Sequence, residues 1–293
     1  MKKNKLYLVM AIVFFMVIAL GSGSSSDDSK NTDISSDTTE SETKVDVTID
    51  ETVIFEQNDI KVTAKEIVTD SIWGQGIKLL IENNSSSDVV VSCDALAVNG
   101  YMLTDFLYET VTAGQKSNST IYCLSSELEK AGISNIGEVD IWFYLLNPDT
   151  YERIYESNEP SIIKTSAYDT IDSSLDIGGE EILNQDGVRI VAKYVDEDSF
   201  WGKSVLIYAE NNSGYDISLT CNDESINGFM IDGYYYATIK NGYKSFDTLE
   251  FFDSTLEENG IDKIENLKMK FSCYDTSSYR TLFESDYIEI YAQ

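Results

Sequence analysis

The sequence has no histidine, only two prolines and only four cysteines among its 293 residues. Histidine is the commonest general base and metal ligand, and the usual partner of a serine or cysteine nucleophile. A hydrolase built from this chain would therefore have to use carboxylates alone. We expect no catalytic residue, no cofactor and no metal. The two prolines, Pro148 and Pro160, lie near expected strands of the first half, where an edge position tolerates them.

Basic residues are scarce as well. The chain has 21 Lys and Arg against 51 Asp and Glu, which gives a net charge of −30. Phosphate binding needs a basic face, so nucleic acid is not an expected partner, and neither is an anionic lipid surface held by charge. The acidic runs 196–198 and 222–224 raise calcium binding as an alternative, but neither has the spacing of a known calcium loop.

The four cysteines fall on positions that strand alternation turns toward a core: Cys93, Cys123, Cys221 and Cys273. Two interpretations stay open. Buried thiols are favoured, because two of the four are replaced by Phe251 and Leu145 at the equivalent positions of the other half. The alternative is one disulfide in each half, Cys93 with Cys123 and Cys221 with Cys273, which an extracytoplasmic compartment permits.

The N-terminus carries a targeting signal. Three lysines precede fifteen apolar residues from Leu6 to Leu20. A helix of this length spans about 23 Å, less than the roughly 30 Å core of a bilayer, which favours cleavage over a permanent anchor. The segment resembles a lipoprotein signal, but Ser22 stands where the lipid-accepting cysteine would be. We expect an extracytoplasmic protein that is secreted, or anchored to the cell membrane by Leu6 to Leu20.

The rest of the chain is duplicated. Residues 51–165 align with residues 179–293 at a constant offset of 128, as from Asp70 to Asp198, without a gap. The predicted organisation is a signal peptide or N-terminal membrane anchor (1–21), a disordered Ser/Thr/Asp-rich linker (22–45), an immunoglobulin-like domain (46–166), a linker (167–178) and a second immunoglobulin-like domain (179–293).

Within each repeat, strict alternation of apolar and polar residues predicts strands. Ile60, Val62 and Ala64 share one face, as Val188, Ile190 and Ala192 do in the second copy. The Asn-Gly pairs 99–100 and 227–228 each predict a tight hairpin. The fold class is therefore all-β, with two tandem antiparallel β-sandwiches of immunoglobulin-like type.

One short helix is expected in each repeat. Ser126 with Glu129, and Ser254 with Glu257, have the spacing of a capping box. Gly132 and Gly260 are placed to end the two helices.

A family resemblance rests on three strings of the first repeat: Ser-Ile-Trp-Gly at 71–74, Ile-Glu-Asn-Asn-Ser at 81–85 and Val-Asn-Gly-Tyr-Met at 98–102. The second repeat has Phe-Trp-Gly at 200–202, Glu-Asn-Asn-Ser at 210–213 and Ile-Asn-Gly-Phe-Met at 226–230. In these strings the chain resembles the telokin-like, immunoglobulin-fold domains of unknown function found in secreted proteins and lipoproteins of Gram-positive bacteria. The resemblance implies a fold and a compartment, and carries no catalytic residue.

Aromatic residues give the one indication of a recognition surface. Tyr234, Tyr235 and Tyr236 are consecutive, so at least one must leave the core, and Trp142 and Tyr144 alternate with core residues of their strand. The candidate binding residues are Trp142, Tyr144 and Tyr235. The alternative is that these rings cover a second layer, the contact between the two repeats or a sheet edge.

Together these features predict a non-enzymatic binding, adhesion or spacer protein of the bacterial cell envelope. Its expected partner is an unidentified protein or polysaccharide at the cell surface. The alternative from a different class is a carboxylate-based hydrolase of cell-wall or extracellular polysaccharide, which would need two carboxylates about 5 to 9.5 Å apart in a cleft.

Overall fold

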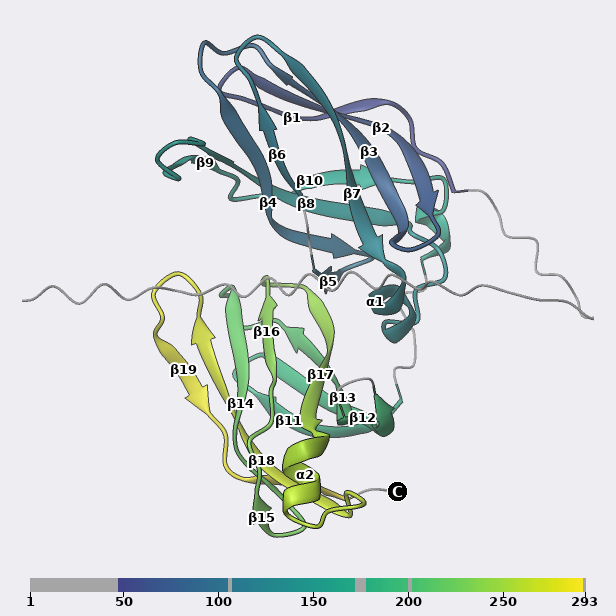
Figure 1. Cartoon of the computed structure of the whole chain (residues 1–293), viewed down its shortest axis with the longest axis vertical. Helices are drawn as coiled ribbons and strands as arrows, with labels where there is room; N and C mark the ends of the chain where they lie inside the picture. Colours follow the sequence, from purple (N-terminus) through teal and green to yellow (C-terminus); the bar gives the residue numbers. More distant parts are fainter. Residues whose placement is uncertain (1–46, 105–106, 172–177, 200–201, 292–293) are drawn as a thin grey trace, which may run out of the picture. The chain divides into compact units, whose positions relative to one another are not determined.

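The computed structural model describes residues 47–104, 107–171, 178–199 and 202–291, with the backbone alone at 194–199 and 202 (Figure 1). The predicted signal or anchor segment 1–21 and the predicted linker 22–45 lie outside these ranges. No helix among the described residues is long and apolar enough to cross a membrane.

The first repeat is a sandwich of two sets of antiparallel strands. One set has the order β1-β2-β3-β7. Its bounds are Thr52–Gln57, Ile60–Asp70, Gly74–Asn83 and Lys116–Leu124. The other is built on the pair β4 (Val89–Val98) and β8 (Glu138–Leu146), to which four short strands add. These are β5 (Tyr101–Leu103), β6 (Tyr108–Val111), β9 (Arg153–Glu156) and β10 (Ser161–Lys164).

The second repeat has the same arrangement. Its first set of strands runs β11-β12-β13-β17. The bounds are Glu180–Gln185, Val188–Ser199, Gly202–Asn211 and Lys244–Phe252. The second set is built on β14 (Ile217–Ile226) and β18 (Asn266–Asp275). Four short strands extend it: β15 (Phe229–Met230), β16 (Tyr236–Ile239), β19 (Thr281–Glu284) and β20 (Ile288–Tyr291). The predicted all-β fold class is confirmed.

Alternation places the core as predicted. Ile60, Val62 and Ala64 are buried in one sandwich, and Val188, Ile190 and Ala192 in the other. Each repeat has its own large apolar cluster between its two sets of strands. Burial of these side chains is the main stabilising contribution, about 1.5–3 kcal/mol for each large aliphatic or aromatic residue.

The cysteines lie in these cores. Cys123, Cys221 and Cys273 are buried free thiols, and the Sγ of buried Cys93 donates to the carbonyl of Ala95 at 2.8 Å. The favoured interpretation, buried thiols, is confirmed. Neither proposed disulfide is formed, because the second cysteine of each pair, Cys123 and Cys273, is a free thiol.

The two short helices are α1 (Ser125–Lys130) and α2 (Asp253–Glu258), and the predicted capping boxes were wrong. Each helix follows directly from a strand, with Leu124 and Phe252 as N-cap residues and no side-chain cap hydrogen bond. Ser126 and Ser254 therefore lie inside the first turn, where their hydroxyls cannot cap it. The predicted ends are confirmed, since Gly132 and Gly260 have φ of 69° and 67°.

The Asn-Gly hairpins form as predicted, and each asparagine does more than turn the chain. Asn99 has φ of 51°. Its Oδ1 accepts from the amides of Gly137 and Glu138 at 2.8 and 3.0 Å, and its Nδ2 donates to the carbonyl of Asn135. Asn227 makes the same three bonds one repeat later. Both hairpins are thereby fixed to the segment that leads into β8 or β18.

A second asparagine network explains the repeated Glu-Asn-Asn-Ser string. The fully buried Asn83 donates to the carbonyls of Ser87 and Val111, both at 2.8 Å, and its Oδ1 accepts from the amide and hydroxyl of Ser85. Asn211 repeats all four bonds. The side chain satisfies backbone groups that the strand ends leave unpaired.

The two repeats meet through the β4–β5 hairpin. The amide of Lys244 in β17 donates to the carbonyl of Gly100 at 3.0 Å, and Tyr101 pairs with Lys244 in parallel orientation. This pairing joins strands of both repeats into one ten-stranded sheet. Residues 45–293 form one compact unit, so the division into two independent domains stays a prediction.

Candidate functional site

Trp142, the first predicted binding residue, is not exposed. Its side chain lies on the outer face of β8 as alternation predicted, but only 3% of its surface reaches solvent. The ring of Tyr243, just before β17, packs edge-on against it with centroids 5.1 Å apart and planes at 75°. Lys240 lies over the same ring at 5.7 Å. The expectation of an exposed Trp142 was wrong, and the alternative of a contact between repeats was right for this residue.

Tyr235 was also assigned wrongly. It is 4% exposed and belongs to the core of the second repeat, where it meets Phe271 edge-on at 5.8 Å. The prediction that a member of the tyrosine run leaves the core is confirmed by its neighbours, because Tyr234 and Tyr236 are both exposed. Three consecutive tyrosines in a strand must alternate between its two faces, but the run does not show which of them points inward.

Tyr144 lies on the outer face of β8 and is half-buried. The guanidinium of Arg153 covers its ring at 4.3 Å from the centroid. Arg153 is itself held by Asp94 at 2.8 Å and by Glu156. The face of this tyrosine is therefore occupied by a fixed side chain, and the structure does not bring Trp142, Tyr144 and Tyr235 together in one site.

An exposed aromatic surface does exist, on the outer face of the sheet around β14 and β18. Strand pairing sets Tyr236 beside Thr220 and Thr220 beside Ser272, while Asn222 faces Lys270 one step along. Tyr287, just before β20, lies beside Lys270. We call this surface the open face; its residues are Thr220, Asn222, Tyr236, Lys270, Ser272 and Tyr287. Both tyrosines are about half exposed.

Hydrogen bonds hold the open face in place. The Nδ2 of Asn222 donates to the hydroxyls of Ser272 at 2.9 Å and Thr220 at 3.3 Å. Asp223, at a bulge with φ of 55°, binds the ammonium of Lys270 at 3.2 Å and accepts from the hydroxyl of Tyr287 at 3.3 Å. The Asp223 contact raises the pKa of Lys270. The lysine therefore stays charged beneath the ring of Tyr287, which it approaches to 4.2 Å.

The corresponding face of the first repeat is different. The positions of Asp223, Lys270 and Ser272 are occupied there by Ala95, Trp142 and Tyr144. Ala95, Ala97 and Trp142 form a small apolar cluster against Met102 and Tyr243. Tyr243 of the second repeat thus covers Trp142, whereas Tyr108, at the position of Tyr236, is as exposed as Tyr236. The two faces differ at Asp223, Lys270 and Tyr287, where the first repeat has Ala95, Trp142 and Glu159.

A polar group of side chains lies inside the second sandwich, where the first has mainly apolar residues. Glu224 and Tyr235 replace Leu96 and Leu107, and both are buried. Three buried atoms find no hydrogen-bond partner among the described residues: Glu224 Oε1, Tyr235 OH and Ser245 Oγ. Burial raises the pKa of Glu224, and burial likewise raises the pKa of Asp247, next to Ser245, to about 6.

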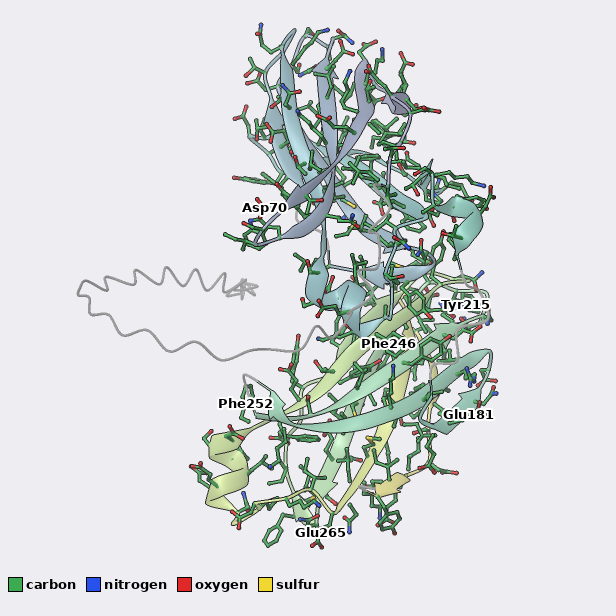
Figure 2. The ribbon with its side chains drawn as sticks, turned by 90° about the vertical axis from the view of Figure 1, so that its right-hand side faces the viewer. Asp70, Glu181, Tyr215, Phe246, Phe252 and Glu265 are labelled. Atoms are coloured by element: carbon green, nitrogen blue, oxygen red, sulfur yellow. The ribbon has the colours of Figure 1, made fainter. Side chains whose placement is uncertain are left out.

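The carboxylates that recur between the repeats have structural partners. Asp88 and Asp216 accept from the amides of Ala113 and Asn241, both at 2.9 Å. Asp70 (Figure 2) caps the β2–β3 turn by accepting from the amides of Trp73 and Ile72, and these two bonds lower its pKa. Such roles agree with the interpretation of the repeated strings as turn and core motifs.

Neither calcium alternative gains support. In the run 222–224, Glu224 points inward while Asn222 and Asp223 are exposed, so the three do not converge. The side chains of 196–198 lie outside the described residues. Among the described residues, no three carboxylate or cysteine side chains are grouped so as to hold a metal ion.

A cavity of about 270 Å³ opens at one end of the first sandwich, between the β1–β2, β3–β4 and β8–β9 turns. Its polar lining residues are Asn58, Ser85, Ser87, Asp88 and Asn147. Asp88 is the one carboxylate of this lining, and it already binds the amide of Ala113. Glycoside hydrolysis needs a pair of carboxylates, so this cavity does not favour the hydrolase alternative.

Comparison with known proteins adds little. No protein-family model and no curated protein matches the sequence. Among solved structures, the chain is similar to a protein of unknown function from Porphyromonas gingivalis W83, at 10% identity over 74% of this chain and 89% of that one, with a TM-score of 0.20.

A second similar structure is the CsuC–CsuE chaperone–tip adhesion subunit pre-assembly complex of the archaic chaperone-usher Csu pili of Acinetobacter baumannii. It is 9% identical, covering 78% of this chain and 99% of that one, with a TM-score of 0.22. Likeness at this level carries no argument about function. What stands is the architecture of the chain itself, a duplicated immunoglobulin-like β-sandwich.

Proposed function

We propose that this chain is a non-enzymatic, extracytoplasmic binding or adhesion protein of the bacterial cell envelope, and that it holds its partner on the open face. The observation that carries the proposal is the contrast between the two repeats. At the positions of Lys270 and Tyr287, the same sheet face of the first repeat has Trp142, which is covered by Tyr243, and Glu159. In the second repeat these positions hold a charged lysine and a half-exposed tyrosine. The N-terminal signal and the resemblance to telokin-like domains of Gram-positive envelope proteins supply the compartment.

The chemistry of the open face fits a polysaccharide. Tyr236 offers a ring face on which the C–H side of a sugar can stack. The ring of Tyr287 lies 4.4 Å from the ammonium of Lys268 and 4.2 Å from that of Lys270, and it forms the other end of the open face. Between them, the hydroxyl of Thr220 and the amide of Asn222 lie at the surface, where they can exchange hydrogen bonds with sugar hydroxyls. These groups are already ordered by one another, so binding costs little side-chain entropy.

The test uses the full chain and insoluble bacterial peptidoglycan with its attached polysaccharide. We expect co-sedimentation that falls at least tenfold in affinity in Tyr236→Ala and in Tyr287→Ala. Tyr279→Ala removes a tyrosine that is also exposed but belongs to the β18–β19 turn, and should bind as the unaltered chain does. Sedimentation unchanged by the first two variants would overturn the open face as the binding site.

The non-enzymatic part of the proposal has its own test. Incubation with the same polysaccharide should release no new reducing ends. Turnover that disappears on replacing one Asp or Glu would establish the hydrolase alternative instead.

A further inference from the structure

The chain contains two copies of one hairpin, and one copy shows how such a hairpin is bound. Tyr101, at the tip of the β4–β5 hairpin, is 7% exposed and stacks on Phe246 with centroids 5.7 Å apart and planes at 10°. Tyr208 meets the same ring of Tyr101 at 6.4 Å. Phe246 projects from β17 (Figure 2). We call the surface that receives Tyr101 the acceptor face; it consists of Val191, Leu206, Tyr208 and Phe246.

The matching hairpin of the second repeat has the same turn, but its tip is exposed among the described residues. Asn227 and Gly228 have φ of 51° and 87°, against 51° and 82° at Asn99 and Gly100. The residues that follow are Phe229 and Met230, in place of Tyr101 and Met102. We call these two the hairpin tip. Phe229 is 48% exposed and Met230 is 77% exposed, although both are apolar.

Neither acceptor-type face among the described residues suits the hairpin tip of a second copy of this chain. The acceptor face of the second repeat is already filled by Tyr101 of the same chain. At the equivalent positions the first repeat has Thr63, Lys78, Leu80 and Asn118, three of which are polar. Head-to-tail assembly of identical chains is therefore blocked at both candidate surfaces.

We propose that the hairpin tip docks on another protein, on a β-sheet face with the chemistry of the acceptor face. That chemistry is an aliphatic and aromatic centre with a rim that is basic on balance, since Arg189, Lys193 and Lys244 lie there against one carboxylate, Glu210. In this chain Lys193 lies 5.2 Å from the ring of Phe246, and Lys244 lies 5.5 Å from the ring of Tyr101. A basic rim also suits a chain with a net charge of −30.

The test exposes the acceptor face of this chain and measures whether the hairpin tip of another copy binds to it. The variant Tyr101→Ser with Met102→Ser removes the ring of Tyr101 from the acceptor face, which Ala131 and Ile133 also contact, and removes Met102 from the neighbouring cluster around Trp142. The tip of one full-length chain can then bind the place that the Tyr101 ring leaves in the next. Light scattering should give a one-chain mass for the unaltered protein, and for the variant a mass at least twofold higher that rises with concentration.

Two further variants decide whether the tip is responsible. Adding Phe229→Ser and Met230→Ser should return the mass to that of one chain. Adding Phe252→Ser instead, which removes a similarly exposed phenylalanine at the end of β17 (Figure 2), should leave the association in place. Association that persists without the tip, or no association of a variant whose circular dichroism is unchanged, overturns the proposal.

If Tyr101→Ser with Met102→Ser prevents folding, a grafted acceptor replaces it. The changes Lys78→Leu, Leu80→Tyr and Asn118→Phe place three of the four acceptor residues on the first repeat. The mass should again rise in this variant and return to that of one chain when Phe229→Ser and Met230→Ser are added. Vesicles of phosphatidylcholine test whether the tip binds lipid instead of protein. If the unaltered chain binds these vesicles and Phe229→Ser with Met230→Ser does not, the tip is a lipid-binding element and the proposal of a protein partner is overturned.

Discussion

The hydroxyl of Tyr243 donates a hydrogen bond of 2.9 Å to Oδ2 of Asp140, linking the second repeat to the first across 103 positions of the chain. Asp140 is buried, and its other oxygen, Oδ1, has no partner among the described residues. Burial raises the pKa of Asp140 to about 6, although the Tyr243 bond acts in the opposite direction. The contact between the repeats therefore contains a carboxyl group that is easier to bury protonated than ionised.

Asp140→Asn should stabilise the protein at pH 7.5 and change little at pH 4. The folded chain holds the Asp140 proton more tightly than the unfolded chain, so stability falls as the pH rises from about 4 through about 6. An amide keeps an acceptor for Tyr243 and does not ionise. We expect a gain of about 1 to 3 kcal/mol at pH 7.5, measured by urea unfolding at both pH values. A gain of equal size at pH 4 would contradict the ionisation argument, and Asp286→Asn, at an exposed site, serves as the control.

Glu224→Leu, which installs the residue of the first repeat, should also stabilise the second. The buried carboxylate with an unpartnered oxygen costs about 1 to 3 kcal/mol at neutral pH. Because burial raises its pKa above the ordinary glutamate value of 4.5, the cost falls as acid protonates the group, so the gain should shrink as the pH falls toward 4.5 and change little below it. Thermal unfolding at pH 7.5 and pH 4 measures both effects. A destabilised variant at pH 7.5 would mean that Glu224 has a favourable partner in solution.

Asn83→Ala and Asn211→Ala should each destabilise the protein strongly. Each change leaves two carbonyls without their donor inside the sandwich, at a cost of about 2 to 4 kcal/mol. Asn84→Ala is the matched control, since it removes the next asparagine, which is exposed, and should cost little. Denaturant unfolding gives the three values. Similar losses at Asn83 and Asn84 would refute the structural role of the repeated string.

Cys123 and Cys273 should resist alkylation in the native protein. Burial raises the pKa of both thiols to about 12, so almost none of the reactive thiolate is present at pH 8. Iodoacetamide followed by mass spectrometry should show both residues unmodified in the native chain and modified in urea. Rapid labelling of the native protein would show that the sandwiches open on the time scale of the reaction.

Local features of the sequence were enough to predict the strands and hairpins, but not the functional surfaces. Alternation at Ile60 to Ala64 and the Asn-Gly pairs act over a few residues, so each string fixes its own conformation. The prediction that Trp142 is exposed was wrong because Tyr243, which covers it, belongs to the other repeat. The capping boxes were wrong because α1 begins directly where β7 ends, so Leu124 is the N-cap residue and Ser126 lies within the first turn. Glu127, which was not part of the predicted box, accepts from the amide and hydroxyl of distant Thr104.

The open face was not predicted, although part of the pattern that indicates it is present in the sequence. Tyr236 and Thr238 alternate with the core residues Ala237 and Ile239, so their outward direction follows from the strand pattern. Tyr287 and Asp223, by contrast, reach Lys270 only through a bulge and a turn, and neither is visible as a period in the sequence. A binding surface assembled from three strands depends on register, which single strings do not encode.

The fixed Asn-Gly turns also affect the chemical ageing of the protein. Asparagine followed by glycine deamidates when the glycine nitrogen attacks the side-chain carbonyl carbon, which requires a side chain free to swing toward its own backbone. At Asn99 and Asn227 that carbonyl accepts two amides and the Nδ2 is held by a third backbone group. Deamidation at either site must wait for the turn to open, so the relative rates at Asn99 and Asn227 report which repeat opens more often.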